Sequence, residues 1–358
     1  MDLFIGSENI ISPLGNTASE NFNSLRRNES GIQKHINVGF KGEDVYLSKI
    51  DSKSIDFYSL LEQSFSESIK GISDEIIESG RCLVFVSTTK GDLSHVNEDS
   101  IHSSVQRLQN QFKLANYPLI VSNACISGIL ALNAAAKLIR SEKYDHAIVI
   151  GCDVVSDFIL YGFQSLFAIS ELPCEPFSAD RKGITLGEGA ATIVMSKDKD
   201  IFFASPLRYL SGSSSNDANH ISGPSRTGEG LARTIIKTIE NANVLISDID
   251  YISAHGTGTL YNDEMESIAL DRLKLNDVPI NSLKGYYGHT LGAAGVIETV
   301  VSMQCLRNNY LIKSLGYKEQ GTSCNINMIQ KNLEREIKVV LKTSSGFGGC
   351  NASAILSK

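Results

Sequence analysis

The chain has 358 residues, of which 42% are hydrophobic and 20% charged, as in globular proteins with enough apolar material for a core. A formal net charge of −7 argues against general nucleic-acid binding. The seven cysteines are scattered without a C-x-x-C pair, which argues against a disulfide framework and a structural zinc site. No apolar run reaches the ~18 residues of a membrane-spanning helix, and no signal peptide is evident, so we expect a cytoplasmic protein without membrane insertion.

Along the chain, short apolar runs alternate with helical patterns, which predicts an α/β fold. The predicted strands are Leu83–Ser87, Leu119–Ser122, Ala147–Gly151, Ala191–Met195, Tyr251–Ala254, Val278–Asn281, Ile337–Lys342 and Ala352–Leu356. The predicted helices are Thr17–Arg27, Ile55–Gly71, Ile126–Ser141, Gly230–Asn241, Asp263–Leu273 and Gly292–Arg307. The stretch Ser211–Gly230 is rich in Gly, Ser, Asn and Pro and is predicted to be a functional loop or a boundary between halves.

One pattern occurs twice in the sequence: a strand, a tight turn and a helix of small residues. In "PLIVSNACISGILALNAAAKLI" the pattern places Cys125 at the start of a helix, and in "PINSLKGYYGHTLGAAGVIETVVSM" it places His289 there. Two similar halves would let these groups meet across a pseudo-twofold axis. The repeat is one of pattern more than of residue identity.

Cys125 lies in a turn of small residues before the apolar face of a predicted helix. Most free cysteines are buried and inert, which is the alternative to a reactive role. A thiol at a helix N-terminus meets the positive end of the dipole and unpaired N–H groups, which would lower its pKa and favour the thiolate. The same amides could hold an oxyanion during acyl transfer, so Cys125 is a candidate nucleophile.

Two histidines follow predicted strands. His255 opens "HGTGT", in which the hydroxyls of Thr257 and Thr259 could meet a polar ligand; the alternative is a histidine in an ordinary glycine turn. His289 precedes small residues that permit close helix packing, and the positive helix terminus should keep it neutral and able to donate a hydrogen bond. Lys284, five residues upstream, would by itself be taken for a solvated loop lysine.

Near the C-terminus, "SSGFGGCNASAIL" places Phe347 among three glycines between two β-like runs. This pattern fits a β-hairpin turn. It also fits a flexible loop whose backbone approaches a ligand, with Phe347 as a plug. The patterns of phosphate-binding glycine loops do not occur.

These four stretches, in this order, resemble the β-ketoacyl-acyl carrier protein synthases of the thiolase superfamily, in the elongating type with one cysteine and two histidines. "ISPLGN", "NESGI" and "GFQSLFAIS…EPFSADRKGITLGEGAATIVM" resemble further segments of that family. The resemblance covers nearly the whole chain. It implies an α/β, thiolase-like fold of layers α-β-α-β-α, with residues 1–200 as the N-terminal ketosynthase half and residues 201–358 as the C-terminal half.

The resemblance implies a role for each matching residue of the reaction centre. Cys125 would take an acyl group from a carrier thioester. His255 and His289 would stabilise the enolate that forms when a malonyl extender loses carbon dioxide. Lys284 would support the histidines, and Glu298 would be structural. The expected activity is a decarboxylative Claisen condensation in fatty-acid, polyene or polyketide-type chain elongation.

The resemblance also implies how the substrate is held. Thr257 and Thr259 would hold the phosphopantetheine arm, and Phe347 would gate the pocket. The backbone N–H groups of Cys125 and Phe347 would form the oxyanion hole. No cofactor or metal is implied, because the arm arrives on an acyl carrier protein. The expected assembly is a homodimer or a heterodimer with a related ketosynthase-like subunit.

The sequence departs from this family pattern in several places. The segment before Cys125 is shortened to "SSVQRLQNQFKLANYP", which puts the acyl tunnel and the mode of dimerisation in doubt. Ile126 is bulkier than the usual residue after the cysteine, so the pocket mouth could differ, and Ser345 replaces a common aromatic. Glu171 and Leu172 stand where a basic residue for the carrier is common. We therefore expect carrier recognition to use other residues, such as Arg26, Arg27 or Arg181.

Three alternatives remain open from sequence. The first is a chain-length-factor-like partner subunit, although such subunits usually lack the nucleophile. The second is a degradative thiolase, for which Cys350 next to the glycine loop would supply a second cysteine. The third is a carrier-binding scaffold without catalysis, in which no thiol reacts.

Overall fold

The computed structural model describes residues 1–51, 56–93, 101–217 and 223–358. Its largest sheet contains β1 (Phe4–Ile11), β4 (Cys82–Ser87), β5 (Leu119–Val121), β6 (His146–Asp153), β8 (Gly189–Ser196), β9 (Leu207–Asn216), β10 (Tyr251–Ser253), β11 (Ile280–Asn281), β14 (Val339–Gly346) and β15 (Cys350–Ser357). The shorter strands are β2 (Ile32–His35), β3 (Val45–Ser48), β7 (Leu186–Gly187), β12 (Tyr310–Leu311) and β13 (Leu333–Glu334).

Ten helices and three short 3₁₀ turns connect the strands in the described residues. The α-helices are α1 (Ala18–Arg26), α2 (Phe57–Ser68), α3 (Asp74–Ile77), α4 (His102–Gln111), α5 (Ser127–Arg140), α6 (Asp157–Ser165), α7 (Glu229–Ala242), α8 (Leu260–Arg272), α9 (Lys284–Tyr287) and α10 (Ala294–Asn308). The 3₁₀ turns are η1 (Lys199–Ile201), η2 (Ile246–Asp248) and η3 (Leu291–Ala293). No helix of the described chain is both long and apolar enough to cross a bilayer.

The two halves of the large sheet share one pattern of strand order and direction. Its order is β11-β10-β14-β15-β9-β1-β8-β6-β4-β5. In the first half β4 is parallel to β5 and β6, and β8 is antiparallel to β6 and β1. In the second half β10 is parallel to β11 and β14, and β15 is antiparallel to β14 and β9. The pairing of β1 with β9 joins the two sets, so the predicted internal repeat is present in strand order and direction.

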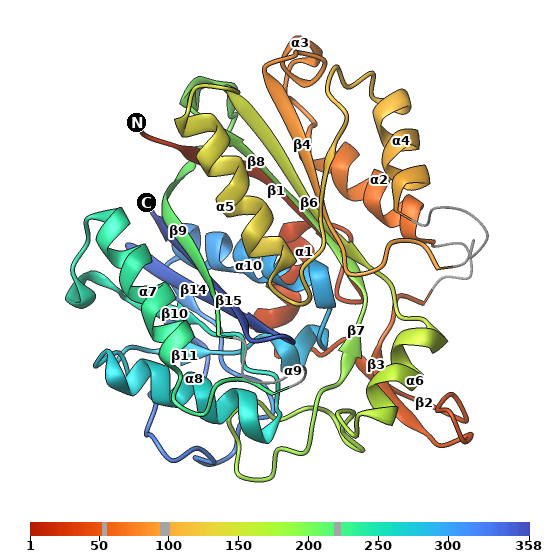
Figure 1. Ribbon diagram of the computed structural model, residues 1–358, viewed down its shortest axis with the longest axis vertical. Coiled ribbons are helices and arrows are strands. Elements are labelled where there is room, and N and C mark those ends of the chain that lie inside the picture. Colours follow the sequence, from red (N-terminus) through yellow and green to blue (C-terminus); the bar gives the residue numbers. More distant parts are fainter. Residues whose placement is uncertain (52–55, 94–100, 218–222) are drawn as a thin grey trace.

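The helices form three layers around the two sets of strands. In Figure 1, α2 and α4 lie on one side of the molecule, α7 and α8 lie on the opposite side, and α5 and α10 lie between. The layers of the predicted α-β-α-β-α fold are therefore present. A separate hydrophobic cluster fills each space, and the central cluster joins Ile129 of α5 to Val296 of α10.

The two central helices approach closely because each has a glycine at the crossing. A Cβ atom on Gly128 would lie 2.8 Å from the backbone N of Val296, and one on Gly295 would lie 2.8 Å from the backbone N of Ile129. The small-residue stretches therefore permit close helix packing, as predicted. This contact matters for the site, because the turns that precede the two helices carry Cys125 and His289.

The main elements agree with the sequence, but one predicted loop is wrong in part. Residues 211–216 of the predicted loop Ser211–Gly230 continue strand β9 and pair with β15; residues 218–222 lie outside the described part of the chain. The small side chains fit here because α5 crosses closely: a Cβ on Gly212 would collide with Asn133 Oδ1. The division between residues 200 and 201 falls between β8 and β9 and stays a prediction.

Candidate active site

Cys125 lies in the turn between β5 and α5, two residues before the helix begins. Ala124 has a φ of +44°, a left-handed conformation that alanine seldom adopts. The Ser127 hydroxyl donates to the carbonyl of Ala124 (2.7 Å) and accepts the N–H of Asn123 (2.8 Å). The hydroxyl of Ser344 on β14 donates to the carbonyl of Cys125 (3.1 Å). Both halves of the protein therefore hold this strained turn in place.

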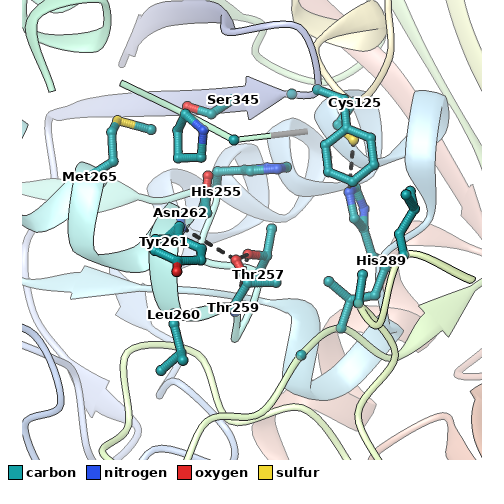
Figure 2. A pocket seen from close by; sticks show the side chains of 18 of the residues that line it. Cys125, His255, Thr257, Thr259, Leu260, Tyr261, Asn262, Met265, His289 and Ser345 are labelled. Carbon is teal, nitrogen blue, oxygen red and sulfur yellow. Dashed lines mark hydrogen bonds between the residues drawn. The ribbon is translucent and has the colours of Figure 1, made fainter. Parts of the chain in front are cut away.

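The thiol and both predicted histidines share one cavity of about 410 Å³. Figure 2 shows Cys125, His255 and His289 lining it, with a dashed line between the sulfur and the ring of His289. The Sγ atom lies 3.0 Å from His289 Nε2, and the centroids of the two imidazole rings lie 5.2 Å apart. The structure thus brings together three residues that are 34 to 164 positions apart in sequence.

The surroundings of His289 fix its tautomer. Its Nδ1 accepts the backbone N–H of Leu291 (3.2 Å). Burial, together with the charges of Lys284 and Lys342, keeps the pKa of His289 well below its usual value, so the ring is neutral. A neutral ring that accepts at Nδ1 carries its proton on Nε2, which faces Cys125. The predicted neutral donor is confirmed, although α10 begins only at Ala294 and burial, not the helix dipole, is the main cause.

His255 has the same protonation for a related reason. Lys284 Nζ lies 3.2 Å from His255 Nδ1 and 2.5 Å from the carbonyl oxygen of His255. An ammonium donates to Nδ1, so the ring proton is on Nε2. Burial lowers the pKa of His255 well below its usual value, and Lys284, His289 and Lys342 lower it further. The alternative of a solvated loop lysine is wrong for Lys284, since its side chain is buried and ion-paired with Glu298 (2.8 Å).

Glu298 on α10 binds two lysines. Its Oε1 lies 2.8 Å from Lys284 Nζ, and its Oε2 lies 2.7 Å from Lys342 Nζ. These charges hold the pKa of Glu298 below its usual value despite burial. Lys342 was not identified from sequence as a site residue. The available signal was a lysine inside the apolar strand pattern "VVLKTSSG", because both faces of such a central strand are buried.

Two carboxylates hold the "HGTGT" loop and were also missed. Glu266 accepts the N–H groups of His255 (2.9 Å) and Gly256 (2.6 Å). Asp263 accepts the N–H of Thr257 (2.9 Å). The two acids lie three residues apart on α8, and this spacing after the threonines was the available sequence signal. They satisfy buried backbone donors that would otherwise destabilise the loop.

The predicted pantetheine-binding hydroxyls lie beside the cavity. The hydroxyls of Thr257 and Thr259 are 2.9 Å apart, and both residues line the cavity wall (Figure 2). Thr259 is also the N-cap of α8, where its hydroxyl accepts the N–H of Asn262 (3.4 Å). One threonine thus ends the loop and begins the helix. Their contact with a substrate arm stays a prediction.

Phe347 lies in the hairpin turn between β14 and β15, at the cavity. The glycine loop is therefore both a β-hairpin turn and part of the cavity lining. The backbone N–H of Phe347 lies near enough to the Cys125 sulfur to lower the pKa of the thiol, and the Phe347 ring packs against Phe163 with centroids 5.5 Å apart. Gly346 permits this approach, because a Cβ there would lie 3.1 Å from the backbone N of Cys125. The gating role stays a prediction.

The protonation of Cys125 differs from the expectation. Burial raises the pKa of the thiol to about 12, while Lys284 and the Phe347 N–H act in the opposite direction. The predicted lowering by the helix dipole is therefore wrong, because desolvation of a fully buried sulfur outweighs it. The resting sulfur is a thiol that faces the Nε2–H of His289, and the thiolate forms as the minor species.

We expect the acylation of Cys125 by a small acyl thioester to accelerate about tenfold per pH unit between about pH 6 and 9. The raised pKa lies above this range, so the small thiolate fraction grows tenfold with each unit. Mass spectrometry of the acyl-enzyme after brief mixing would measure this. A rate that stays flat across the range would mean that the thiolate is already formed at neutral pH.

The cluster of Cys125, His255 and His289 is also a candidate metal site by residue type. The ligand atoms of Cys125, His255 and His289 lie within 4.8 Å of one another. A metal needs the lone pairs of the nitrogens that face it, and both rings here carry the proton on the Nε2 atom. The cluster as protonated is suited to hold an anionic oxygen rather than a cation.

Several weaker sequence predictions have different outcomes. Arg181 is buried, and its guanidinium donates to the carbonyls of Ser178 (2.9 Å) and Gly321 (2.5 Å), so its assignment to carrier docking is wrong. Ile126 packs in the central core and does not line the cavity, so the expected change at the mouth is wrong as well. Ser345 does line the cavity. The docking roles of Arg26 and Arg27 stay predictions.

Comparison with known proteins decides the family. The model of the β-ketoacyl synthase N-terminal domain matches residues 99–200, and that of the β-ketoacyl synthase C-terminal domain matches residues 209–318. The chain belongs to the β-ketoacyl synthase family. The predicted resemblance is therefore confirmed, and it extends over both halves of the repeat.

Individual relatives agree with this assignment. The chain is 34% identical over 257 residues to 3-oxoacyl-acyl-carrier-protein synthase 2 of Rhizobium meliloti, a match that covers 66% of this chain but only 60% of that protein. It is 25% identical to the protein of the same name from Coxiella burnetii, over 98% of this chain and 96% of the relative. A chain of the solved complex of the ketosynthase ApeO with its chain length factor ApeC, from Xenorhabdus doucetiae, matches with a TM-score of 0.90 at 26% identity, covering 99% of this chain and 98% of that one.

Proposed function

We propose that the protein is a β-ketoacyl-acyl carrier protein synthase that condenses an acyl thioester with a malonyl thioester. One observation carries this proposal: a sulfur 3.0 Å from one neutral imidazole, with a second neutral imidazole in the same cavity. Membership of the family and the relatives named above support it. The reaction belongs to fatty-acid, polyene or polyketide-type chain elongation.

The first step transfers the acyl group to the enzyme. The Cys125 thiolate attacks the thioester carbon, and the carbonyl electrons move to oxygen. The backbone N–H groups of Cys125 and Phe347 would hold that oxyanion, and the Phe347 N–H already acts to lower the pKa of the thiol. The intermediate then collapses, and the carrier leaves as its pantetheine thiolate, which takes up the proton lost by Cys125.

The second step forms the carbon–carbon bond. The malonyl thioester loses carbon dioxide, and the electron pair of the broken bond becomes an enolate. The Nε2–H groups of His255 and His289 would donate to the enolate oxygen, where negative charge develops. The enolate carbon attacks the acyl thioester of Cys125, and the sulfur leaves as the thiolate. No external oxidant or reductant is needed.

The proposal includes no resident cofactor. The reactive arm is the phosphopantetheine of the carrier, which would run past Thr257 and Thr259 to the sulfur. Their paired hydroxyls, 2.9 Å apart, can exchange that bond for bonds to amides of the arm. The proposed setting is the reducing cytoplasm, because a nucleophilic thiol must stay reduced to attack a thioester.

The partner proposed for this site is an acyl carrier protein. The exposed residues around the cavity indicate which contacts would recognise it. Five large hydrophobic side chains that line the cavity are exposed: Leu166, Phe167, Leu260, Tyr261 and Phe347. Phe167 is 94% exposed and has a left-handed φ of +54°. Among the described lining residues, Lys182 is the one with a formal charge. A carrier that meets this mouth would therefore be recognised mainly through apolar contacts.

We expect Phe167→Ser and Tyr261→Ser each to raise the KM for a carrier-linked acyl substrate about three- to tenfold, because each removes apolar contact area at the rim. The acyl-pantetheine thioester without its carrier should react at the original rate. Raising the salt concentration should change KM only slightly, since apolar contacts are not screened. Steady-state kinetics with both substrates would measure this.

Leu245→Ser is the matched control, because Leu245 is 68% exposed and lies outside the cavity lining. It should leave both KM values unchanged. Docking would instead be assigned to basic residues such as Arg26 and Arg27 by two results together. Carrier affinity would fall steeply with salt, and Phe167→Ser and Tyr261→Ser would leave the KM for the carrier-linked substrate unchanged.

The competing functions have less support. A chain-length-factor-like subunit would not need the thiol and both histidines, although assembly with such a subunit, or with a second copy, is part of the proposal. A degradative thiolase would need Cys350 in the cavity, yet its sulfur donates to the Phe347 carbonyl (3.2 Å) and does not line the cavity. A scaffold without catalysis would not need buried lysines around two histidines.

The test is direct. The protein is incubated with a panel of acyl-carrier substrates and malonyl-carrier, alone and with candidate partner subunits, and the products are read by mass spectrometry. A product two carbons longer with a β-keto group supports the proposal. Cleavage of a β-ketoacyl substrate by free coenzyme A would favour the thiolase, and no reaction in any combination would favour the scaffold.

A further inference from the structure

Lys342 is a fully buried lysine on β14, in a cage of oxygen atoms. Its Nζ lies 2.7 Å from Glu298 Oε2 and 2.6 Å from the carbonyl oxygen of Thr343. The carbonyl oxygens of Ser253 and Ala254 lie at 3.2 and 3.4 Å. All four neighbours are acceptors, which matches an ammonium and not a neutral amine. An unpaired ammonium here would be strongly destabilising, so the cage is specific to a cation.

The cage connects to His255 in two ways. Ser253 and Ala254 directly precede His255, so Lys342 holds the strand end from which that imidazole projects. Glu298 is shared with Lys284, whose ammonium donates to His255 Nδ1. A change at Lys342 would therefore reach His255 along two routes, through the backbone and through the carboxylate.

The charges around the histidines can be named element by element. Glu298 comes from α10, Lys284 from α9, Glu266 from α8 and Lys342 from β14. Glu266 is bound to the N–H groups of His255 and Gly256 and to the hydroxyl of Thr343 (3.1 Å). Glu298 balances only one of the two ammonium groups that contact it. The remaining positive charge disfavours a second proton on either imidazole.

We propose that Lys342 is a positioning residue of the condensing site: its ammonium holds Glu298 and the end of β10 so that both imidazoles stay neutral with Nε2–H aimed at the substrate oxygen. This inference rests on the proposed function. A second proton on either ring would go to Nδ1, which faces the Leu291 N–H in His289 and the Lys284 ammonium in His255. Each Nδ1–H would then face another hydrogen-bond donor, and the two hydrogen bonds that orient the rings would be lost.

The central test compares Lys342→Met with the original protein in the two half-reactions. Methionine keeps the length of the side chain and removes the charge. We expect decarboxylation of malonyl-carrier to fall about 10- to 100-fold, because the donors shift from the enolate position. Acylation of Cys125 should keep most of its rate. The acid limb of the decarboxylation profile should move to higher pH, since the histidines then protonate more readily.

A purely structural lysine predicts something else: both half-reactions would fall by one common factor, and the acid limb would not move. That result would overturn the inference. Arg307→Met is the matched control, because Arg307 is a largely buried cation on the same helix as Glu298 but pairs with Glu8. It should lower thermal stability without moving the acid limb.

Chemical rescue provides a second variant. Lys342→Ala empties the cage, and ammonium ions should restore decarboxylation several-fold, whereas tetramethylammonium at equal ionic strength should not, because it cannot donate hydrogen bonds. Equal effects of the two salts would overturn the proposed cation site. If neither variant folds, a nitrogen-15 titration of the histidines in the original protein decides: protonation of either ring at pH 7 would contradict the inference.

The condensation assay of the original protein separates this inference from the proposed function. If that protein condenses but Lys342→Met leaves the histidine titration unchanged, the inference alone fails. If it does not condense, the proposed function fails, and the histidine titrations of the two proteins still decide whether Lys342 sets their protonation.

Discussion

Replacing Cys125 with alanine is expected to abolish chain transfer while malonyl decarboxylation remains measurable. Without the sulfur no acyl-enzyme can form, so condensation should fall more than about 1,000-fold. The two Nε2–H donors remain, and they are the groups assigned to the enolate. Intact-protein mass spectrometry would report the missing acyl-enzyme, and release of carbon dioxide from malonyl-carrier would report the surviving half-reaction.

The matched control for this substitution is Cys350→Ala. Cys350 is another buried thiol, close to the same hairpin, but it does not line the cavity. It should keep acyl-enzyme formation and condensation. If Cys350→Ala abolished turnover while Cys125→Ala did not, Cys125 would not be the nucleophile. The degradative thiolase with Cys350 as a catalytic cysteine would then be favoured.

The repeated pattern is what made the pairing of Cys125 with His289 predictable. Two strand–turn–helix units with glycines at the helix starts must place their turns together if the helices cross at those glycines. Gly128 and Gly295 do cross there. The sequence therefore predicted which turns meet, even though residue identity between the halves is weak.

The protonation of the site was not fully predictable, because it depends on burial in three dimensions. The helix-start argument for Cys125 had the right geometry, but the sulfur is so desolvated that its pKa rises. For His289 the same argument gave the correct neutral state, but burial and the charges of Lys284 and Lys342 are what lower the pKa. A local pattern indicates which dipoles are near a group, but not how much water the rest of the fold removes.

For the same reason, the sequence did not predict which charged side chains pair with one another. Lys284 and Lys342 are 58 positions apart in sequence, and each looks like an ordinary lysine until Glu298 joins them. Arg181 shows the opposite error: a basic residue in a polar segment was assigned to the surface, yet the fold uses its donors to satisfy buried carbonyls. Sequence spacing cannot distinguish these outcomes.

The two histidines should differ in a way that tests the geometry of the site. His255→Ala and His289→Ala are each expected to lower malonyl decarboxylation about 100- to 1,000-fold, because each removes one donor from the enolate oxygen. His289 alone lies 3.0 Å from Cys125 Sγ, so only its loss should also slow acylation of the cysteine. Rapid-mixing measurements of acyl-enzyme formation and of carbon dioxide release would separate the two effects.

The control for this asymmetry is His289→Gln, whose side-chain amide can place an N–H near the position of Nε2. It should recover part of the activity lost in His289→Ala, whereas a role as a general base would give no recovery. If His255→Ala slowed acylation as much as His289→Ala, the sulfur would depend on both rings equally. The 3.0 Å contact would then not explain how the thiol is oriented. Because His289 alone contacts both the sulfur and the proposed enolate position, it is the residue through which the two half-reactions share one site.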